Sequence, residues 1–85
     1  MFTGIIETLG EVIAIKHEGE NVHFTIKCPF IKELKVDQSL AHNGVCLTII
    51  NIENDNYTVT AIKETLAKSS LGNLKIGSKV NLERA

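Results

Sequence analysis

Cys46 and Thr48 are the residues whose types and spacing first suggest chemistry. They alternate with Val45, Leu47 and Ile49 in the segment HNGVCLTII, which reads as a strand opened by an Asn-Gly corner. If the aliphatic side chains face a core, the thiol and the hydroxyl point to the opposite face of the strand. Either these two groups meet a ligand there, or Thr48 is an ordinary β-branched strand residue.

A free cysteine is usually buried, so we expect something to cover Cys46. The covering group would be a helix predicted near residues 63–71, a partner chain or a ligand. Lys63, Glu64 and Thr65 open that helix, either as a solvated first turn or as a polar lip with free N–H groups beside the strand. Ser39 also fits plain turn chemistry. Together these residues suggest a groove with a polar rim and an apolar floor for a small neutral molecule.

Histidine and cysteine chemistry receives little support from the sequence. His17 lies in a predicted turn and His23 on the polar phase of a strand, so we expect both to be solvated, and we interpret His42 as non-catalytic. Cys28 and Cys46 form no Cys-x-x-Cys or Cys/His ligand pattern. We therefore predict no metal site. The two cysteines could pair, but a cytosolic chain keeps its thiols reduced, so we predict two free thiols.

Period-two alternation of apolar residues predicts a strand-rich chain. The expected strands cover residues 4–15, with a bend or bulge at Gly10, and residues 21–28, 45–52, 56–62 and 77–83. Residues 29–34 suit one short turn, and residues 62–72 suit a helix of two to three turns that Gly72 ends. The expected core consists of Phe24, Ile26, Val45, Leu47, Ile49, Val59, Val80 and Leu82. This pattern predicts a small closed barrel with one short helix, forming a single domain over residues 1–85.

Composition excludes several classes of function. The 85 residues carry a net charge of −1, with nine basic residues dispersed among ten acidic ones, and aromatic residues make up 5% with no Trp. Nucleic-acid binding, including that of an oligonucleotide-binding barrel, needs a basic face and stacking aromatics, so it is disfavoured. No segment reads as a signal peptide or a membrane span, and we expect a cytoplasmic protein without a membrane partner.

Three segments resemble one known family. MFTGIIE, AHNGVCLT and KETL...LG.LK.G..VNLERA occur in the order and spacing of the N-terminal half of riboflavin synthase, the trimeric alpha-chain type. The resemblance spans all 85 residues, and its combination of motifs is shared only with the non-catalytic lumazine-binding fluorescence proteins. The chain departs in the segment VDQS at 36–39, which keeps Ser39, and the family continues beyond NLERA into a second barrel.

The resemblance implies an all-β, six-stranded antiparallel Greek-key barrel that binds 6,7-dimethyl-8-ribityllumazine. In this family of transferases, two lumazines react without a cofactor to give riboflavin and 5-amino-6-ribitylamino-uracil, at a site between barrels of neighbouring subunits. The implied substrate-binding residues are Gly4, Ile5, Ile6, Cys46, Leu47, Thr48, Thr60, Ala61, Ile62, Lys63, Glu64 and Thr65. Ser39 and Cys46 match polar residues that assist the reaction, and Phe2 matches an aromatic near the donor substrate.

The resemblance also implies partners. The first hypothesis is the substrate-binding barrel of a riboflavin synthase, and the alternative is a lumazine- or flavin-binding protein without turnover. The family's second barrel carries a histidine discussed as a proton carrier, and this chain has no equivalent. We therefore expect the 85 residues alone to bind lumazine and riboflavin with little or no activity. We also expect them to form a homodimer, and the full-length enzyme to be a homotrimer.

Overall fold

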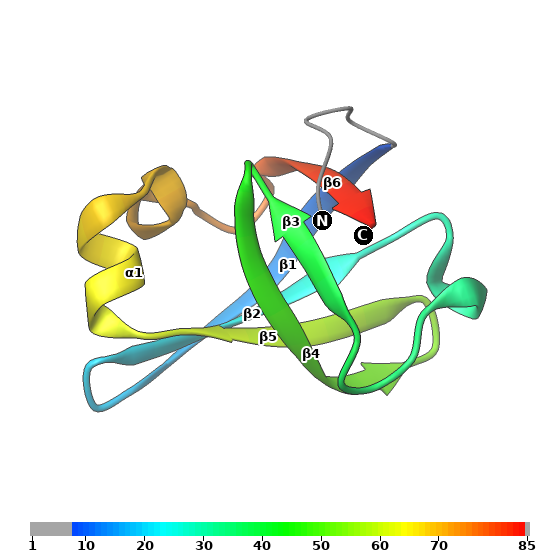
Figure 1. Cartoon of the computed structure of the whole chain (residues 1–85), viewed down its shortest axis with the longest axis horizontal. Helices are drawn as coiled ribbons and strands as arrows, with labels where there is room; N and C mark the ends of the chain where they lie inside the picture. The colour runs from blue at the N-terminus through cyan, green and yellow to red at the C-terminus, as the bar shows by residue number, and fades with distance from the viewer. Residues whose placement is uncertain (1–7, 85) are drawn as a thin grey trace.

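The computed structural model describes residues 8–84, which form a closed six-stranded antiparallel barrel (Figure 1). The strands are β1 (Thr8–Glu18), β2 (Asn21–Lys27), β3 (Ser39–His42), β4 (Val45–Glu53), β5 (Asn56–Ala61) and β6 (Lys79–Arg84). Their order around the barrel is β1-β2-β5-β4-β3-β6, so the links from β2 to β3 and from β5 to β6 pass over neighbours, as in a Greek key. Each strand pairs with a neighbour on both sides over at least part of its length, and the predicted fold class is confirmed.

Two-residue turns join three of the strand pairs. The Asn43-Gly44 turn joins β3 to β4, with φ angles of 50° and 86° that asparagine and glycine tolerate. It pairs His42 with Val45 and thereby places Ser39 opposite Thr48. The strand before this turn was absent from the periodicity prediction. An Asn-Gly pair flanked by β-prone residues on both sides was the signal for it.

Gly10 has a different role from the predicted one. The register shift in β1 lies between Val12 and Ala14, where β1 pairs with β2, and not at Gly10. A Cβ atom at Gly10 would lie 2.7 Å from Ile26 Cγ2 and 2.8 Å from Leu82 Cδ1. Glycine is therefore needed because β1 passes close to the side chains of both neighbouring strands.

The barrel interior contains nearly all of the predicted core. Phe24, Ile26, Leu47, Ile49, Val59, Val80 and Leu82 are buried. Val45 is only half-buried, which corrects its prediction as a core residue, because it directly follows the turn at the end of the barrel. The buried interior also includes His42 and Tyr57.

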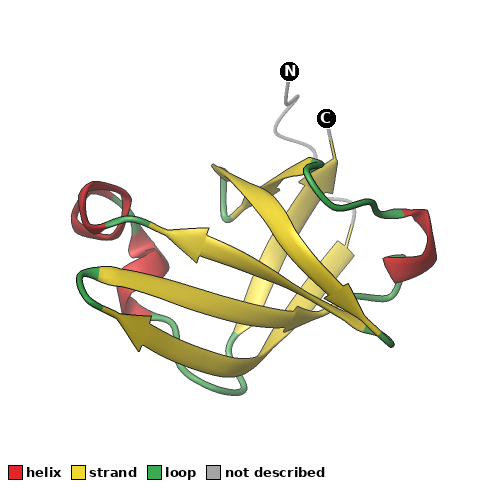
Figure 2. Cartoon of the chain, turned by 90° about the horizontal axis from the view of Figure 1, so that it is seen from below, coloured by secondary structure: helices red, strands yellow, loops and turns green. Residues whose placement is uncertain are grey.

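The helical segments lie at the two ends of the barrel, with η1 (Ile31–Glu33) opposite α1 (Lys63–Lys68) and η2 (Ser70–Asn73) (Figure 2). The prediction of one continuous helix over residues 62–72 was wrong, because Ser69 is extended (φ −139°, ψ 172°) and divides it. The Ser69 hydroxyl donates to the Thr65 carbonyl at 2.7 Å and accepts the Leu71 N–H at 3.2 Å. The serine thus ends one helix and caps the next.

Candidate functional site

The paired register between β4 and β5 covers only part of the two strands. It runs from Ile49 opposite Val59 to Glu53 opposite Asn56. Cys46–Thr48 on β4 and Thr60–Ala61 on β5 lie beyond that register, at the end of the barrel where α1 begins. The residues predicted to bind a ligand therefore converge where the two strands part.

The backbone of β4 has a fixed orientation at this point. The Ile49 N–H donates to the Gln38 carbonyl and the Ile49 carbonyl accepts from the Asp37 N–H, both at 2.9 Å, so these groups face the β3 side. Because backbone groups alternate along a strand, those of Cys46 and Thr48 face the opposite side, toward the end of β5. A strand edge of this kind offers alternating donors and acceptors to a flat heterocycle.

The side chains of this part of β4 divide between the two faces. Cys46 and Thr48 are exposed, whereas Leu47 points into the core. The Thr48 hydroxyl lies 3.4 Å from the Ser39 hydroxyl on β3, so two predicted site residues are in contact. Cys46 is a free thiol that α1 does not cover, which leaves a partner chain or a ligand as the expected cover. By the same alternation the backbone groups of Leu47 face β3, where Leu40 is its register partner, so neither its side chain nor its backbone groups are directed at the site.

A pocket of about 370 Å³ lies where α1 meets the start of β4. Its lining includes Val45 of β4 and the predicted site residues Ile62, Glu64 and Thr65. Ile62, which immediately precedes α1, is 54% exposed and supplies an apolar surface. The pocket therefore combines an apolar surface with polar groups of α1, but its lining does not include Ser39, Cys46 or Thr48.

Three predicted residues near α1 make other contacts within the protein. Lys63 forms an ion pair with Glu20 at 3.2 Å, and Glu64 pairs with Lys68 at 3.0 Å along the helix. Ala61 is fully buried in the core. Phe2, Gly4, Ile5 and Ile6 lie outside the described residues. The structure therefore shows two groups of predicted residues, Ser39 with Thr48 on β3 and β4, and Ile62, Glu64 and Thr65 around the pocket beside α1.

Sequence reasoning missed a polar chain that ends at Thr60. The Thr60 hydroxyl lies 2.7 Å from His23 Nδ1, and His23 Nε2 lies 2.7 Å from a Glu18 carboxylate oxygen. The prediction that His23 is merely solvated was wrong, since its side chain is only 20% exposed. The hydrogen bond and the charge of His23 lower the pKa of the Glu18 carboxyl. Both His23 and Thr60 lie on outward strand positions, but only the pairing of β2 with β5 brings them together.

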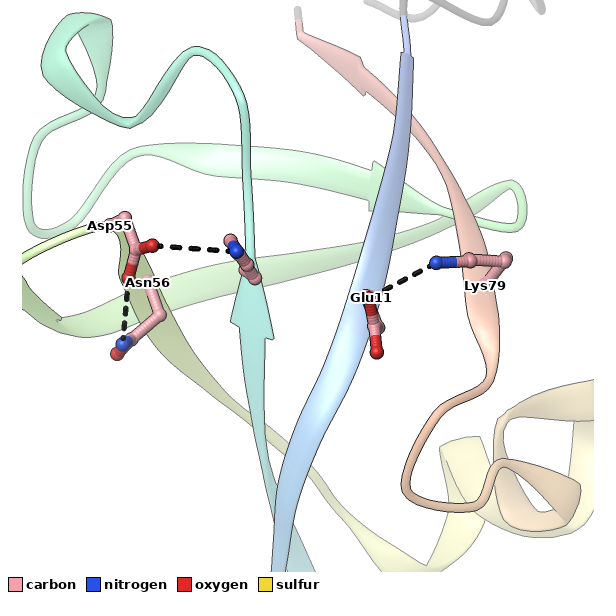
Figure 3. Close-up of polar contacts among 5 residues, drawn as sticks. Glu11, Asp55, Asn56 and Lys79 are labelled. Carbon is pink, nitrogen blue, oxygen red and sulfur yellow. Dashed lines mark hydrogen bonds and ion pairs between the residues drawn. The ribbon is translucent and has the colours of Figure 1, made fainter.

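A larger pocket, of about 510 Å³, lies on another part of the barrel and contains none of the predicted site residues. Glu11 and Lys79 pair at 3.1 Å on one side of it, and Lys27 and Asp55 lie 3.8 Å apart on the other (Figure 3). The four charged groups therefore neutralise one another in pairs. This leaves the edge of β4 as the better candidate for recognition of a small polar ring.

Other classes of site find no support in the part of the chain that the structure describes. Among residues 8–84, no three His, Cys, Asp or Glu side chains are grouped as metal ligands. No helix within the same range is long and apolar enough to cross a bilayer.

Comparison with known proteins identifies the family of this barrel. The family model for the lumazine binding domain matches residues 3–85. The chain belongs to the lumazine-binding domain family. Riboflavin synthase of Bacillus subtilis (strain 168) is 43% identical over 86 residues, and that of Escherichia coli (strain K12) is 36% identical over 87. The chain is covered completely in both comparisons but spans only 40% and 41% of those relatives.

Solved structures of LumP match both the fold and the length of the barrel. LumP complexed with 6,7-dimethyl-8-(1'-D-ribityl) lumazine and LumP complexed with riboflavin both give a TM-score of 0.92 at 29% identity. Each covers 98% of this chain, which corresponds to 48% and 46% of the respective LumP chains. The lumazine-binding domain therefore accounts for nearly the whole of this sequence and about half of these proteins.

Proposed function

We propose that this chain binds 6,7-dimethyl-8-ribityllumazine and riboflavin at the end of the barrel where β4 separates from β5. Membership in the lumazine-binding domain family carries this proposal. The outward-facing backbone of Cys46 and Thr48 supports it, because a pteridine rim alternates hydrogen-bond donors and acceptors. The same edge accommodates the related flavin ring.

In this proposal, the predicted site residues have different roles. The ring lies along Cys46–Thr48, with Ile62 as an apolar contact, and the polar groups of Thr60, Glu64 and Thr65 meet the ribityl chain. Gly4, Ile5 and Ile6 complete the binding surface, and Phe2 lies near the donor substrate. Ser39 and Cys46 assist the reaction. The 3.4 Å contact between Ser39 and Thr48 supports a shared role at one ligand.

The proposed reaction is the dismutation of two lumazines into riboflavin and 5-amino-6-ribitylamino-uracil, without a metal or other cofactor. It requires a second barrel of the same family, because two substrates must be held in one reactive geometry. We propose a homotrimer for the full-length enzyme and a homodimer for the 85 residues alone. The relatives named riboflavin synthase are matched over only 40% and 41% of their length, which supports the requirement for a second barrel.

The isolated chain is proposed to bind well and to react poorly. A displacement of about 1 Å between reacting groups costs around a hundredfold in rate. A missing general acid or base on the second barrel removes a further ~10²- to 10⁴-fold. The visible absorbance of the purified chain would report a retained ligand, and a riboflavin-formation assay would report turnover. Addition of the second barrel in trans is expected to raise turnover.

Three results would each contradict a part of this proposal. The binding function is refuted if neither lumazine nor riboflavin changes fluorescence on titration with the chain. Turnover by the 85 residues alone at the rate of a complete synthase would refute the need for a second barrel. Sedimentation of a monomer at high micromolar concentration would refute the homodimer.

A binding protein without turnover is the second candidate. The similarity to LumP, at a TM-score of 0.92, favours it. Bound flavin together with no riboflavin formation, even with a second barrel present, would select this candidate over a synthase domain.

A further inference from the structure

A row of three polar side chains crosses the outer face of three neighbouring strands. Glu18 comes from β1, His23 from β2 and Thr60 from β5, and His23 is the direct register partner of Thr60. Both contacts of the imidazole are 2.7 Å long. The row runs from the exposed Glu18 carboxylate inward to Thr60, at the edge of the candidate site.

We propose that His23, held by Glu18, is a positioning residue whose neutral imidazole makes the Thr60 hydroxyl a hydrogen-bond acceptor toward the ligand. This inference rests on the proposed function, in which Thr60 lies at the ligand. It assigns His23 and Glu18 a role in setting which ligand group the site accepts.

The carboxylate fixes the tautomer of the neutral imidazole. An ionised carboxylate only accepts hydrogen bonds, so Nε2 carries the hydrogen and donates it to Glu18. Nδ1 is then an acceptor, and the Thr60 hydroxyl must donate to it. The single hydroxyl hydrogen of Thr60 is used in this bond, so Thr60 presents only lone pairs to the site. It therefore selects a ligand donor, a hydroxyl or an N–H, over a carbonyl oxygen.

Protonation of His23 reverses this arrangement. Both ring nitrogens of an imidazolium are donors, so Glu18 still accepts from Nε2 while Thr60 now accepts from Nδ1. The hydroxyl hydrogen of Thr60 is released and turns toward the site, where it opposes a ligand donor. Binding through such a donor is therefore weaker when His23 is protonated.

The charged groups that face His23 are few. Lys16 is its register partner on β1, and Glu18 is on the same strand. Lys63, at the start of α1, forms an ion pair with Glu20 at 3.2 Å. The Glu18 carboxylate pairs with His23. The β5 neighbours Thr58 and Thr60 carry no charge. Glu18 and Lys16 are thus the groups whose charge bears on the imidazole.

The same two strands supply a matched control. Thr25 and Thr58 are the next outward pair along β2 and β5, and their hydroxyls lie 3.2 Å apart. This pair has the position and geometry of a strand contact but no histidine and no carboxylate. Thr58→Val removes a hydroxyl from the same strand and the same face as Thr60.

The test is a riboflavin fluorescence titration of the full chain at about pH 8 and about pH 5.5, a range across which histidine side chains change charge. The wild-type dissociation constant should rise about 3- to 10-fold at the lower pH, as expected for one disturbed hydrogen bond. His23→Gln should remove this pH dependence, and Thr58→Val should keep it. Thr60→Val should weaken binding about 5- to 10-fold at pH 8, while Thr60→Ser should retain it.

Glu18→Gln provides a second variant on a fully exposed group, so it tests the same chain without disturbing the barrel. An amide no longer fixes the tautomer, and the difference between the two pH values should shrink. A His23→Gln variant that keeps the wild-type pH dependence would overturn the role of His23, as would loss of that dependence in Thr58→Val. pH-independent binding of riboflavin by the wild type would overturn only this inference, whereas no binding at either pH would overturn the proposed function as well.

Discussion

His42 and His23 each lie 2.7 Å from a hydroxyl oxygen, one inside the barrel and the other outside it. His42 Nε2 meets the Tyr57 hydroxyl, and His42 Nδ1 lies 3.1 Å from the Leu40 carbonyl. Its ring packs edge-on against Tyr57 with the centroids 5.7 Å apart. His23 instead lies between a threonine and an exposed carboxylate. The length of the histidine–hydroxyl contact is the same, but the ring nitrogen that makes it and its surroundings differ.

Burial decides what each histidine does. His42 is 1% exposed, and removal from water lowers the pKa of its imidazole to about 4, against the opposing effect of backbone contacts with Leu40 and Val45. Burial likewise raises the pKa of the Tyr57 hydroxyl. This pair stays neutral at physiological pH and serves the fold. His23 lies instead on the outer face of the barrel beside an exposed carboxylate, where its contact with Thr60 can influence a ligand.

The largest expected effect comes from titration of the inner histidine. The folded chain holds His42 neutral down to about pH 4, while the unfolded chain protonates it near its ordinary pKa of 6.5. Stability is therefore complete above about pH 6.5, falls as pH drops toward 4, and loses about 3 kcal/mol from this group. Urea unfolding at a series of pH values would measure the loss.

A pair of variants isolates the contribution of His42. His42→Asn should flatten the pH dependence, whereas His17→Gln, at an exposed histidine, should leave it unchanged. An unaltered slope in His42→Asn would show that the buried imidazole is not the source of the acid sensitivity.

An outer-face substitution should change binding without changing the fold. Thr48→Val keeps a β-branched shape in a strand but removes the hydroxyl that contacts Ser39. Riboflavin and lumazine affinity should fall by roughly 1–3 kcal/mol if a buried polar ligand group is left unpaired. Fluorescence titration measures the affinity, and thermal unfolding checks that stability is retained. Unchanged affinity would remove Thr48 from the site.

The smallest expected effect is the difference in stability between substitutions of the two cysteines. Cys28 is buried, and Cys28→Ser should destabilise the chain by about 1 kcal/mol because a hydroxyl costs more to bury than a thiol. Cys46→Ser, at an exposed strand position, should stay within about 0.5 kcal/mol of the wild type. Urea unfolding of both variants compares them directly. Equal losses would mean that the inner and outer faces do not differ as described.

The sequence predicted the barrel well because alternation records which side chains face inward. Phe24, Ile26 and Ile49 were assigned to the core on that basis and are buried. Strand β3 was missed because only four residues precede its turn, and the helix was predicted too long because Ser69 bonds to the backbone on both sides. Short strands and local side-chain hydrogen bonds hardly change the periodicity of apolar residues, so this periodicity does not reveal them.

The candidate site was predictable only in part. The outward phase of Cys46 and Thr48 follows from alternation, and their exposure agrees with it. The contact of His23 with Thr60 joins residues 37 positions apart, so it depends on which strands become neighbours. The parting of β4 from β5 is likewise a property of register. Neither feature is present in any single segment.

The closing strand β6 has a consequence for the order in which the protein is made. It pairs with both β1 and β3, joining Thr8 to Leu82 and His42 to Leu82. Until the ribosome has released the last residues of β6, a nascent chain holds two unpaired strand edges, each able to recruit a neighbouring chain. The hairpins form from nearby residues, but closure awaits a partner more than seventy positions away, and such long-range pairing is slow. The strand of the barrel that is synthesised last is therefore the one that protects the edges of β1 and β3.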